Sequence, residues 1–304
     1  MKIHLITNCT NLKKTNIHGK IQLRNLIENN SARNIVNSWC EQLENAEQKV
    51  PANEVYAGDH WKVAKSIVKP NLELWVLSAG YGLIHNSSKI GSYDATFSSG
   101  SENSINKTGL TNREWWNTLH ERRNSDVSKC ESLRSLVSTN TDDVFFIAAS
   151  PGYLKVIQDE LEQLVLEKKL TNENFFIVSS KHNISEQLIP FFLESKADFC
   201  STLKGGRVSL NIRLAKYLLG ESKANIFDSK NVIDRYNNLE NNAIKLLVKN
   251  RKKLSDEEVI SFIKNELNIN QGAKVSASML LKKLRNENLA CEQKRFSRLL
   301  KELF

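Results

Sequence analysis

Four short apolar runs, each followed at once by small or polar residues, constrain the fold of this chain more than any other feature. We predict strands over Lys2–Thr7, Leu72–Leu77, Val144–Ala149 and Phe175–Ser179. Longer amphipathic patterns separate or follow them, and their spacing favours helices. Strands that alternate with helices indicate an α/β fold with a mainly parallel sheet. The predicted helices cover Ser31–Gln48, His60–Val68, Arg113–Arg122, Gly152–Lys168 and Val208–Leu219.

The loops that follow the predicted strands are candidates for a binding site. In an open parallel sheet, ligands bind at the carboxyl ends of the strands. We therefore expect the four strand-end loops to face one cleft. These loops are Asn8-Cys9-Thr10, Ser78-Ala79-Gly80, Ser150-Pro151-Gly152 and Ser180-Lys181-His182.

The pattern changes after Gly220, and we predict an α/β domain over residues 1–225 and a basic helical module over 226–304. A helical run covers Val232–Asn250, and Ser255 and Glu258 form a capping box that opens a helix over Asp256–Leu267. Two short amphipathic patterns follow with a tight turn between them, which predicts a helix-turn-helix or winged-helix module. They cover Ser276–Asn286 and Cys291–Leu303.

Charge is unevenly distributed along the chain. Of the formal net charge of +9, most lies in the last quarter, where 16 basic residues from Ile226 onward face 10 acidic ones. Such a segment favours a polyanionic partner, although a merely solvated basic face has the same composition. On the last predicted helix an apolar stripe leaves Lys294, Arg295 and Arg298 outward, where they could enter a major groove or contact DNA phosphates. A dimerisation or capping module is the alternative.

Several classes of site have no sequence signature. The five cysteines are widely spaced with no Cys-x-x-Cys, and the six histidines are scattered, so we expect no metal site. Phosphate-cradling glycine motifs are absent, so we expect no nucleotide cofactor. No apolar run reaches the roughly 18 residues that span a bilayer, and the amino-terminal stretch does not resemble a signal peptide. We therefore expect a cytoplasmic chain that does not contact membranes; no protein partner can be inferred.

Two residues near the second strand end are candidates for chemistry. Tyr81 lies between Gly80 and Gly82, where a base or sugar ring could stack on it, but the same residues are typical of a turn with a packed tyrosine. Asp94 is a lone carboxylate beside Tyr93, and such an acid needs either a role or a partner. A structural aspartate that caps the loop is the alternative.

Four segments together carry a resemblance to a known family. The first two thirds of the chain resemble the YaaA-related and archaeosine-synthase-core-related branch of the uracil-DNA glycosylase superfamily. The chain lacks the Gly-Gln-Asp-Pro-Tyr and His-Pro-Ser-Pro loops that are usual in that superfamily. The segments are Thr7-Asn8-Cys9-Thr10-Asn11-Leu12-Lys13-Lys14, Tyr56-Ala57-Gly58-Asp59-His60-Trp61, Leu77-Ser78-Ala79-Gly80-Tyr81-Gly82-Leu83-Ile84 and Tyr93-Asp94-Ala95-Thr96-Phe97.

The resemblance implies a nucleobase pocket at the strand ends and cleavage of an N-glycosidic bond in DNA. A divergent glycosylase core with a basic helical module is similar to bacterial phage-defence glycosylases that excise glucosylated hydroxymethylcytosine from double-stranded viral DNA. In this interpretation the base is flipped out of the stack and its edge is held by hydrogen bonds. The catalytic residues would be Asp94 and Asn8; the base-binding residues Tyr81, Ser78, Tyr93, Ser150 and Tyr153; and the DNA-backbone residues Lys13, Lys204, Arg207, Lys294, Arg295 and Arg298.

Two other functions remain open at this point. The archaeosine-synthase kinship implies modification or exchange of a deazapurine base in nucleic acid. The YaaA kinship allows a non-catalytic DNA-binding stress protein. Formation of abasic sites on modified DNA separates the glycosylase from both, because base remodelling and binding alone leave the sugar occupied.

Overall fold

The computed structural model of the chain describes residues 1–14, 19–27, 32–67, 69–123, 132–220, 227–245, 250–269 and 276–303. The chain divides into two compact units, Met1–Ile244 and Lys245–Phe304. The first unit therefore extends past the predicted end of the α/β domain at residue 225. The extension is helix α9 (Ser229–Asn241), which buries Val232, Tyr236 and Leu239 within the first unit.

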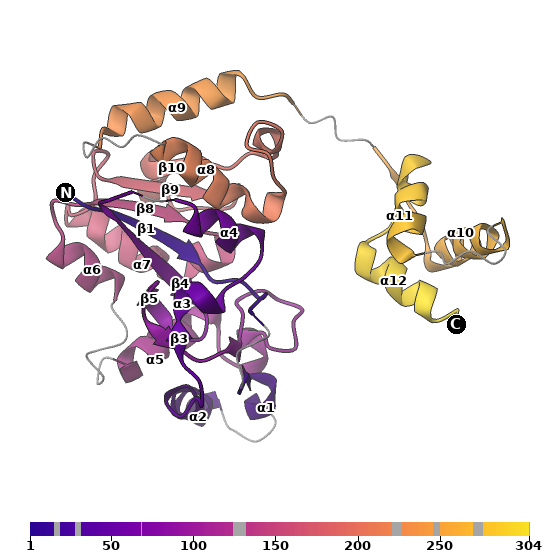
Figure 1. Cartoon of the computed structure of the whole chain (residues 1–304), viewed down its shortest axis with the longest axis horizontal. Coiled ribbons are helices and arrows are strands. Elements are labelled where there is room, and N and C mark those ends of the chain that lie inside the picture. Colours follow the sequence, from indigo (N-terminus) through magenta and orange to yellow (C-terminus); the bar gives the residue numbers. More distant parts are fainter. Residues whose placement is uncertain are drawn as a thin grey trace. The chain divides into compact units, whose positions relative to one another are not determined.

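A six-stranded sheet forms the centre of the described part of the first unit (Figure 1). Its order is β10-β9-β8-β1-β4-β5, and every neighbouring pair is parallel except β4 with β5. The mainly parallel α/β fold predicted from the sequence is confirmed. The strands are β1 (Ile3–Asn8), β4 (Leu72–Ser78), β5 (Gly82–His85), β8 (Val144–Ala148), β9 (Phe175–Ser179) and β10 (Phe192–Glu194).

Two strands of the sheet were not predicted. β5 follows β4 through a tight turn at Gly80 and Tyr81, and β10 is only three residues long. Shorter pairings lie outside the sheet. They are β2 (Ile21–Gln22) with β7 (Tyr93–Asp94), and β3 (Val50–Pro51) with β6 (Lys89–Ile90).

Helices cover both faces of the sheet (Figure 1). Helices α4, α8 and α9 pack on one another at one face, whereas α5 and α6 pack on α7 at the other. Apart from the helix predicted over Val232–Asn250, the predicted helices of this unit are confirmed within a few residues at their ends. The helices of this unit are α1 (Arg24–Ile27), α2 (Ala32–Glu44), α3 (Ala52–Val55), α4 (Asp59–Lys65), α5 (Asn112–Arg123), α6 (Leu133–Thr139), α7 (Pro151–Leu166), α8 (Leu210–Leu219), α9, and the 3₁₀ turns η1 (Ile105–Thr108), η2 (Glu186–Phe191), η3 (Ala197–Cys200) and η4 (Arg207–Ser209).

The second unit packs three helices around its own apolar core. Phe296 and Leu299 of the predicted stripe are buried in that core, and Leu300 and Leu303 pack against it. The capping box is confirmed, because the Ser255 N–H donates to Glu258 at 2.8 Å and the Glu258 N–H donates to the Ser255 hydroxyl at 3.2 Å. The elements are β11 (Lys252–Lys253), α10 (Asp256–Ile269), α11 (Ala277–Asn286), β12 (Leu289–Ala290) and α12 (Gln293–Lys301). The helix predicted over Val232–Asn250 corresponds to α9 of the first unit, which ends already at Asn241; residues 246–249 lie outside the described residues.

None of the helices in the described part of the chain is both long and apolar enough to cross a membrane. The same residues contain no group of three or more His, Cys, Asp or Glu side chains that could hold a metal ion.

Candidate functional site

A polar cavity of about 550 Å³ opens at the carboxyl ends of β1, β8 and β9. Asn8 ends β1, Ser150 follows β8, and Ser180 follows β9, and all three line the cavity. Three of the four predicted strand-end loops therefore meet in one place. Its other lining residues come from the loop after β1, from the first turns of α4, α7 and α8, from the segments before α4 and α8, and from the loop after β7.

The cavity lies between β1 and β8, at the point of the sheet where the order of the strands reverses. The connection from β1 leads through α4 to β4, whereas the connection from β8 leads through α7 to β9 on the opposite side. Adjacent parallel strands whose connections diverge leave a crevice beyond their carboxyl ends, and ligands of open α/β sheets bind there. The position of the cavity follows from the strand order.

Asn8 holds the two strand ends together at the cavity wall. Its Oδ1 accepts the Ser150 N–H at 3.0 Å, and its Nδ2 donates to the Cys9 carbonyl at 2.9 Å. Asn8, predicted to be catalytic, thus lines the cavity, but both ends of its amide already bond to backbone. We assign it a positioning role at this wall.

Asp59 is the only carboxylate among the described residues that line the cavity. It begins α4, and because α4 packs on α8 it meets Arg213 and Ser209. Both carboxylate oxygens accept from Arg213 Nη2 at 2.9 Å, and the Ser209 hydroxyl donates to Oδ2. These hydrogen bonds, from Ser209 and then Arg213, lower the pKa of Asp59. The side chain is 52% exposed, so a fixed negative charge faces the cavity.

His60 is a neutral wall residue beside Asp59. Burial lowers its pKa to about 4. The Thr7 hydroxyl donates to the Ala148 carbonyl at 2.7 Å, so His60 Nε2, 2.8 Å from that hydroxyl, must donate to it. The contact fixes the imidazole between the ends of β1 and β8. Sequence reasoning did not single out Asp59 or His60, although both lie in a segment that carries the family resemblance.

The floor of the cavity is a buried polar cluster. Tyr153 and Cys9 line the cavity, and the Cys9 sulfur lies 3.0 Å from the Tyr153 hydroxyl. Behind them, the Tyr93 hydroxyl lies 3.0 Å from that of Tyr56 and 2.7 Å from that of Ser78. Burial raises the pKa of each of these three tyrosines, which keeps their hydroxyls protonated.

The structure separates the predicted base-binding residues into two groups. Ser150 and Tyr153 line the cavity, as expected. Ser78 and Tyr93 are completely buried beneath it and do not line it. The four segments that carry the family resemblance do meet, because Lys13 pairs with Tyr56 and its Nζ lies 4.2 Å from the centre of the Tyr93 ring.

Tyr81 is a core residue rather than a stacking platform. It is 3% exposed, its hydroxyl accepts the Gly91 N–H at 2.9 Å, and it does not line the cavity. The preceding glycine makes room for a neighbour instead of a ligand, since a Cβ on Gly80 would stand 2.7 Å from the Tyr93 ring. The packed-tyrosine alternative therefore describes the structure.

Asp94 does not reach the cavity either. It lies in β7, which pairs with β2, and its Oδ2 is 2.7 Å from Lys20 Nζ. The predicted catalytic carboxylate therefore has a basic partner outside the cavity lining. We replace it with Asp59 in the interpretation of the site.

The predicted backbone contacts also differ in their environments. Arg207 lines the cavity, whereas Lys204 lines a neighbouring one. Lys13 is 7% exposed with a pKa lowered by burial, so it does not present its ammonium group to a DNA backbone.

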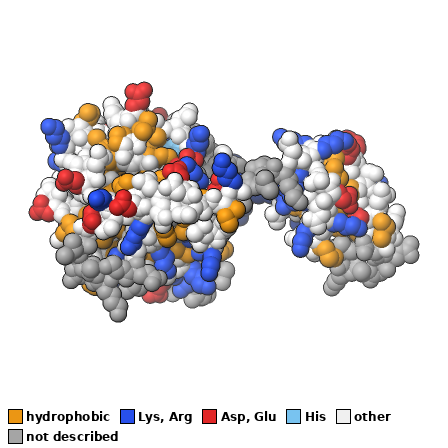
Figure 2. Space-filling model, turned by 90° about the horizontal axis from the view of Figure 1, so that it is seen from above, with side chains coloured by type: hydrophobic (Ala, Val, Ile, Leu, Met, Phe, Trp, Pro, Cys, Tyr) orange, Lys and Arg blue, Asp and Glu red, His pale blue; other side chains and the backbone are white. Residues whose placement is uncertain are grey.

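On α12 the three predicted contacts are not equivalent. Arg295 and Arg298 pair with Asp256, and Arg298 also donates to Glu302 at 2.8 Å. Lys294 is exposed. The face of the unit seen in Figure 2 carries basic and acidic side chains interspersed.

Comparisons with protein-family models, curated proteins and solved structures gave no match.

The packing of Tyr81 predicts a loss of stability on truncation. Tyr81→Ala should lower the free energy of unfolding by about 3–5 kcal/mol, the usual cost of removing a buried aromatic ring. Tyr81→Phe should lose only about 1 kcal/mol, for the hydrogen bond from Gly91. Thermal melting of both variants, with DNA binding measured on the folded protein, checks this. A normal melting temperature with weakened DNA binding in the alanine variant would restore the stacking role.

The buried, neutral His60 predicts a pH-dependent stability. Its folded pKa of about 4 lies below its ordinary value of 6.5, so between these pH values the unfolded chain binds the additional proton. Stability present above pH 6.5 is therefore lost as pH falls to 4, by about 3 kcal/mol. Denaturant unfolding of the unaltered chain and of His60→Gln, measured at several pH values, isolates the contribution of His60 to the pH dependence of stability. Parallel pH profiles of the two proteins would contradict the prediction.

Proposed function

We propose that the chain is a DNA glycosylase that flips a modified nucleobase into the strand-end cavity and hydrolyses its N-glycosidic bond. One observation carries the proposal: among the described residues that line the cavity at the strand reversal, Asp59 is the single carboxylate, held in place by Arg213 beside hydrogen-bonding groups and the cationic Arg207. A cationic sugar develops when this bond breaks, and a pre-positioned negative charge stabilises it. The resemblance of the four segments to the uracil-DNA glycosylase superfamily supports the same reaction.

The cavity lining divides into parts that suit the parts of a nucleotide. Tyr153, Ser150 and Thr96 offer hydroxyl groups to the edge of a base. Arg207 and the beginning of α7 at Ser150 supply positive charge for the phosphate. Asp59 is then left for the sugar. A volume of about 550 Å³ lies within the range of small-molecule sites, and the proposal of glucosylated hydroxymethylcytosine as the target base rests on the resemblance.

In the proposed reaction the bond between C1′ of the sugar and the base nitrogen breaks, and its electron pair leaves with the base. The Asp59 carboxylate stabilises the positive charge that develops on the sugar. A water molecule then adds its oxygen to C1′ and releases a proton, and the departed base takes up one proton from solvent. The products are the free base and an abasic site.

The second unit is proposed to bind the DNA around the target base. It carries 14 basic and seven acidic residues between Lys245 and Phe304, so it holds most of the net positive charge of the chain. Its helices α11 and α12 would form a helix-turn-helix, with Lys294 and Lys301 of α12 toward the phosphates. Both lysines are exposed, whereas Arg295 supports the unit by donating to the Leu254 carbonyl at 2.9 Å.

Asp59→Asn tests the chemistry with the least change of shape. We expect abasic-site formation to fall by roughly 100-fold or more, because the charge opposite the developing cation is removed. The assay compares DNAs with glucosylated hydroxymethylcytosine, hydroxymethylcytosine, uracil or unmodified cytosine, and probes for alkali-labile sites. Asp94→Asn is the matched control and should retain full activity, since its carboxylate pairs with Lys20 outside the cavity.

Two results would overturn parts of the proposal, the first the role of Asp59 and the second the glycosylase activity itself. One is normal turnover by the folded Asp59→Asn protein together with inactivity of Asp94→Asn. The other is the absence of abasic sites on every DNA tested with the unaltered chain. Incorporation of a new base at the target sugar would instead identify base exchange.

The role of the second unit is tested by the salt dependence of binding. Replacing Lys294 and Lys301 with glutamine should reduce the slope of log K against log salt by up to about two, since each phosphate contact on duplex DNA contributes about 0.9. Lys253→Gln with Lys264→Gln removes the same charge from β11 and α10 and should change the slope less. Equal slopes for both double variants would mean that α12 does not face the DNA.

A further inference from the structure

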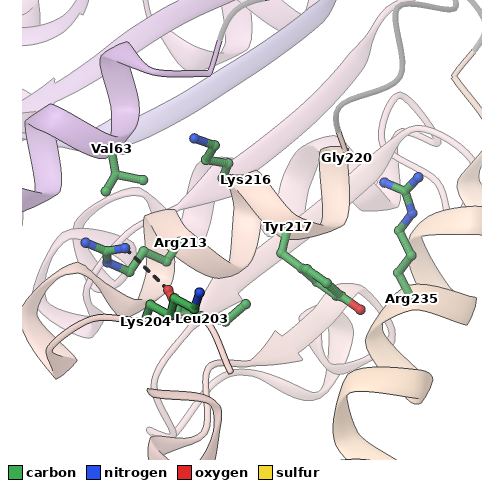
Figure 3. Close-up of a pocket in the computed structure, with 8 residues that line it drawn as sticks. All are labelled: Val63, Leu203, Lys204, Arg213, Lys216, Tyr217, Gly220 and Arg235. Carbon is green, nitrogen blue, oxygen red and sulfur yellow. Dashed lines mark hydrogen bonds between the residues drawn. The ribbon is translucent and has the colours of Figure 1, made fainter. Parts of the chain in front are cut away.

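A second cavity of about 550 Å³ lies beside α8, on the face of the sheet that α8 and α9 cover (Figure 3). Four of the eight residues that line it are basic and none is acidic: Lys204, Arg213, Lys216 and Arg235. Asp59 neutralises Arg213 from the neighbouring strand-end cavity, which leaves three cations without a carboxylate in the described lining. A cavity with this charge suits an anionic ligand.

Two glycines leave room for the arginines of this cavity. A Cβ on Gly220, which has a φ of +66°, would stand 1.6 Å from Arg235 Nη1. A Cβ on Gly205 would stand 2.1 Å from Arg213 Nε. Arg235 Nη1 also donates to the Leu218 carbonyl at 3.2 Å. The guanidinium of Arg235 therefore occupies space that only a glycine leaves open, and it is held at the wall of the cavity.

An aromatic ring lies among these cations. Figure 3 shows Tyr217 extending from α8 toward α9 and Arg235, whereas Lys216 extends from the other side of α8, where its Nζ donates to the Ser66 hydroxyl at 2.9 Å. The ring is partly buried against the core, so one part of it packs and the rest is accessible from the cavity. Cations that follow a backbone, together with an aromatic ring for a base, are the features of grooves that bind single nucleic-acid strands.

The two cavities are neighbours along a continuous surface. Arg213 lines the basic cavity while its guanidinium bonds to Asp59 in the strand-end cavity. Lys204 and Arg207 lie three residues apart on one loop and line one cavity each. A strand whose nucleotide occupies the strand-end cavity would therefore pass Arg207 and reach Lys204.

We infer that the basic cavity binds the DNA strand next to the flipped nucleotide, an assignment that rests on the proposed function. Lys204, Lys216 and Arg235 contact its phosphates, and the Tyr217 ring stacks on a neighbouring base. The DNA bound in this cavity is single-stranded. The cations match the phosphates of one backbone, and the one aromatic ring matches an unpaired base. The cavity thereby holds the flanking strand while the target base is out of the stack.

The test is the binding of a labelled single-stranded DNA of about 12 nucleotides to the full chain at several salt concentrations. Replacing Lys204, Lys216 and Arg235 with glutamine should lower the slope of log K against log salt by about two, at about 0.7 per phosphate. The control replaces the exposed Lys89, Lys107 and Lys155, an equal charge elsewhere on the same unit. It should leave the slope nearly unchanged.

Tyr217 is tested separately in the same assay. Tyr217→Ala should weaken binding about 5- to 150-fold without changing the salt slope, whereas Tyr217→Phe should bind almost normally. Melting temperatures of all variants show whether they are folded. If either variant unfolds, single replacements of Lys204 and Lys216, which are not in the buried core, keep the measurement possible.

The outcomes separate this inference from the glycosylase proposal. Equal salt slopes for the two triple variants would overturn the role of the cavity, even if the chain forms abasic sites normally. If the two triple variants bind DNA with equal salt slopes but differ in their salt slopes for poly-glutamate, the cavity binds an acidic protein. That result would overturn the inference as well. If the salt slope is reduced in the variant of Lys204, Lys216 and Arg235 but the unaltered chain forms no abasic sites on any DNA, single-strand binding by the basic cavity is supported and the glycosylase activity is rejected.

Discussion

The burial of β1 between β8 and β4 is the constraint on which the rest of the first unit depends. Each residue of Ile3–Thr7 is buried, and the strand pairs in parallel on both sides. The connections of β1 and β8 therefore diverge to opposite faces and leave a crevice at their ends. The side chains of Thr7 and Asn8, the last two residues of β1, form hydrogen bonds with the backbone of Ala148 and Ser150 at the end of β8. A slip of this strand by one residue would remove both links.

Much of the fold could be predicted from local sequence. The strands of the sheet centre are continuous apolar runs because they are buried on both faces, and the helices between them carry an apolar stripe. The capping box at Ser255 is equally local, since its partners are three residues apart. By contrast, β5 was missed because the turn at Gly80–Tyr81 looked like a site loop.

The site was harder to predict because it depends on packing between distant segments. Asp94 and Asp59 are both aspartates beside aromatic and glycine-containing segments, so sequence alone does not rank them. The pairing of β2 with β7 turns Asp94 toward Lys20, whereas the packing of α4 on α8 brings Asp59 to Arg213, 154 residues away. In the same way, the glycine at position 80 correctly indicates that another group lies close to the backbone, but that group is the Tyr93 ring rather than a ligand.

The cavity wall has an electrostatic property that follows from its burial and hydrogen bonds. The pKa of Asp59 and that of His60 are both lowered, whereas the pKa of Tyr153 is raised. Each of these three pKa values is thus shifted away from neutral pH, downward for Asp59 and His60 and upward for Tyr153. The protonation of the three groups therefore stays constant over a wide pH range around neutral pH. A wall of this kind acts as a fixed set of charges and dipoles rather than as a proton store. Whatever protons move during a reaction there are carried by the bound molecule and by water.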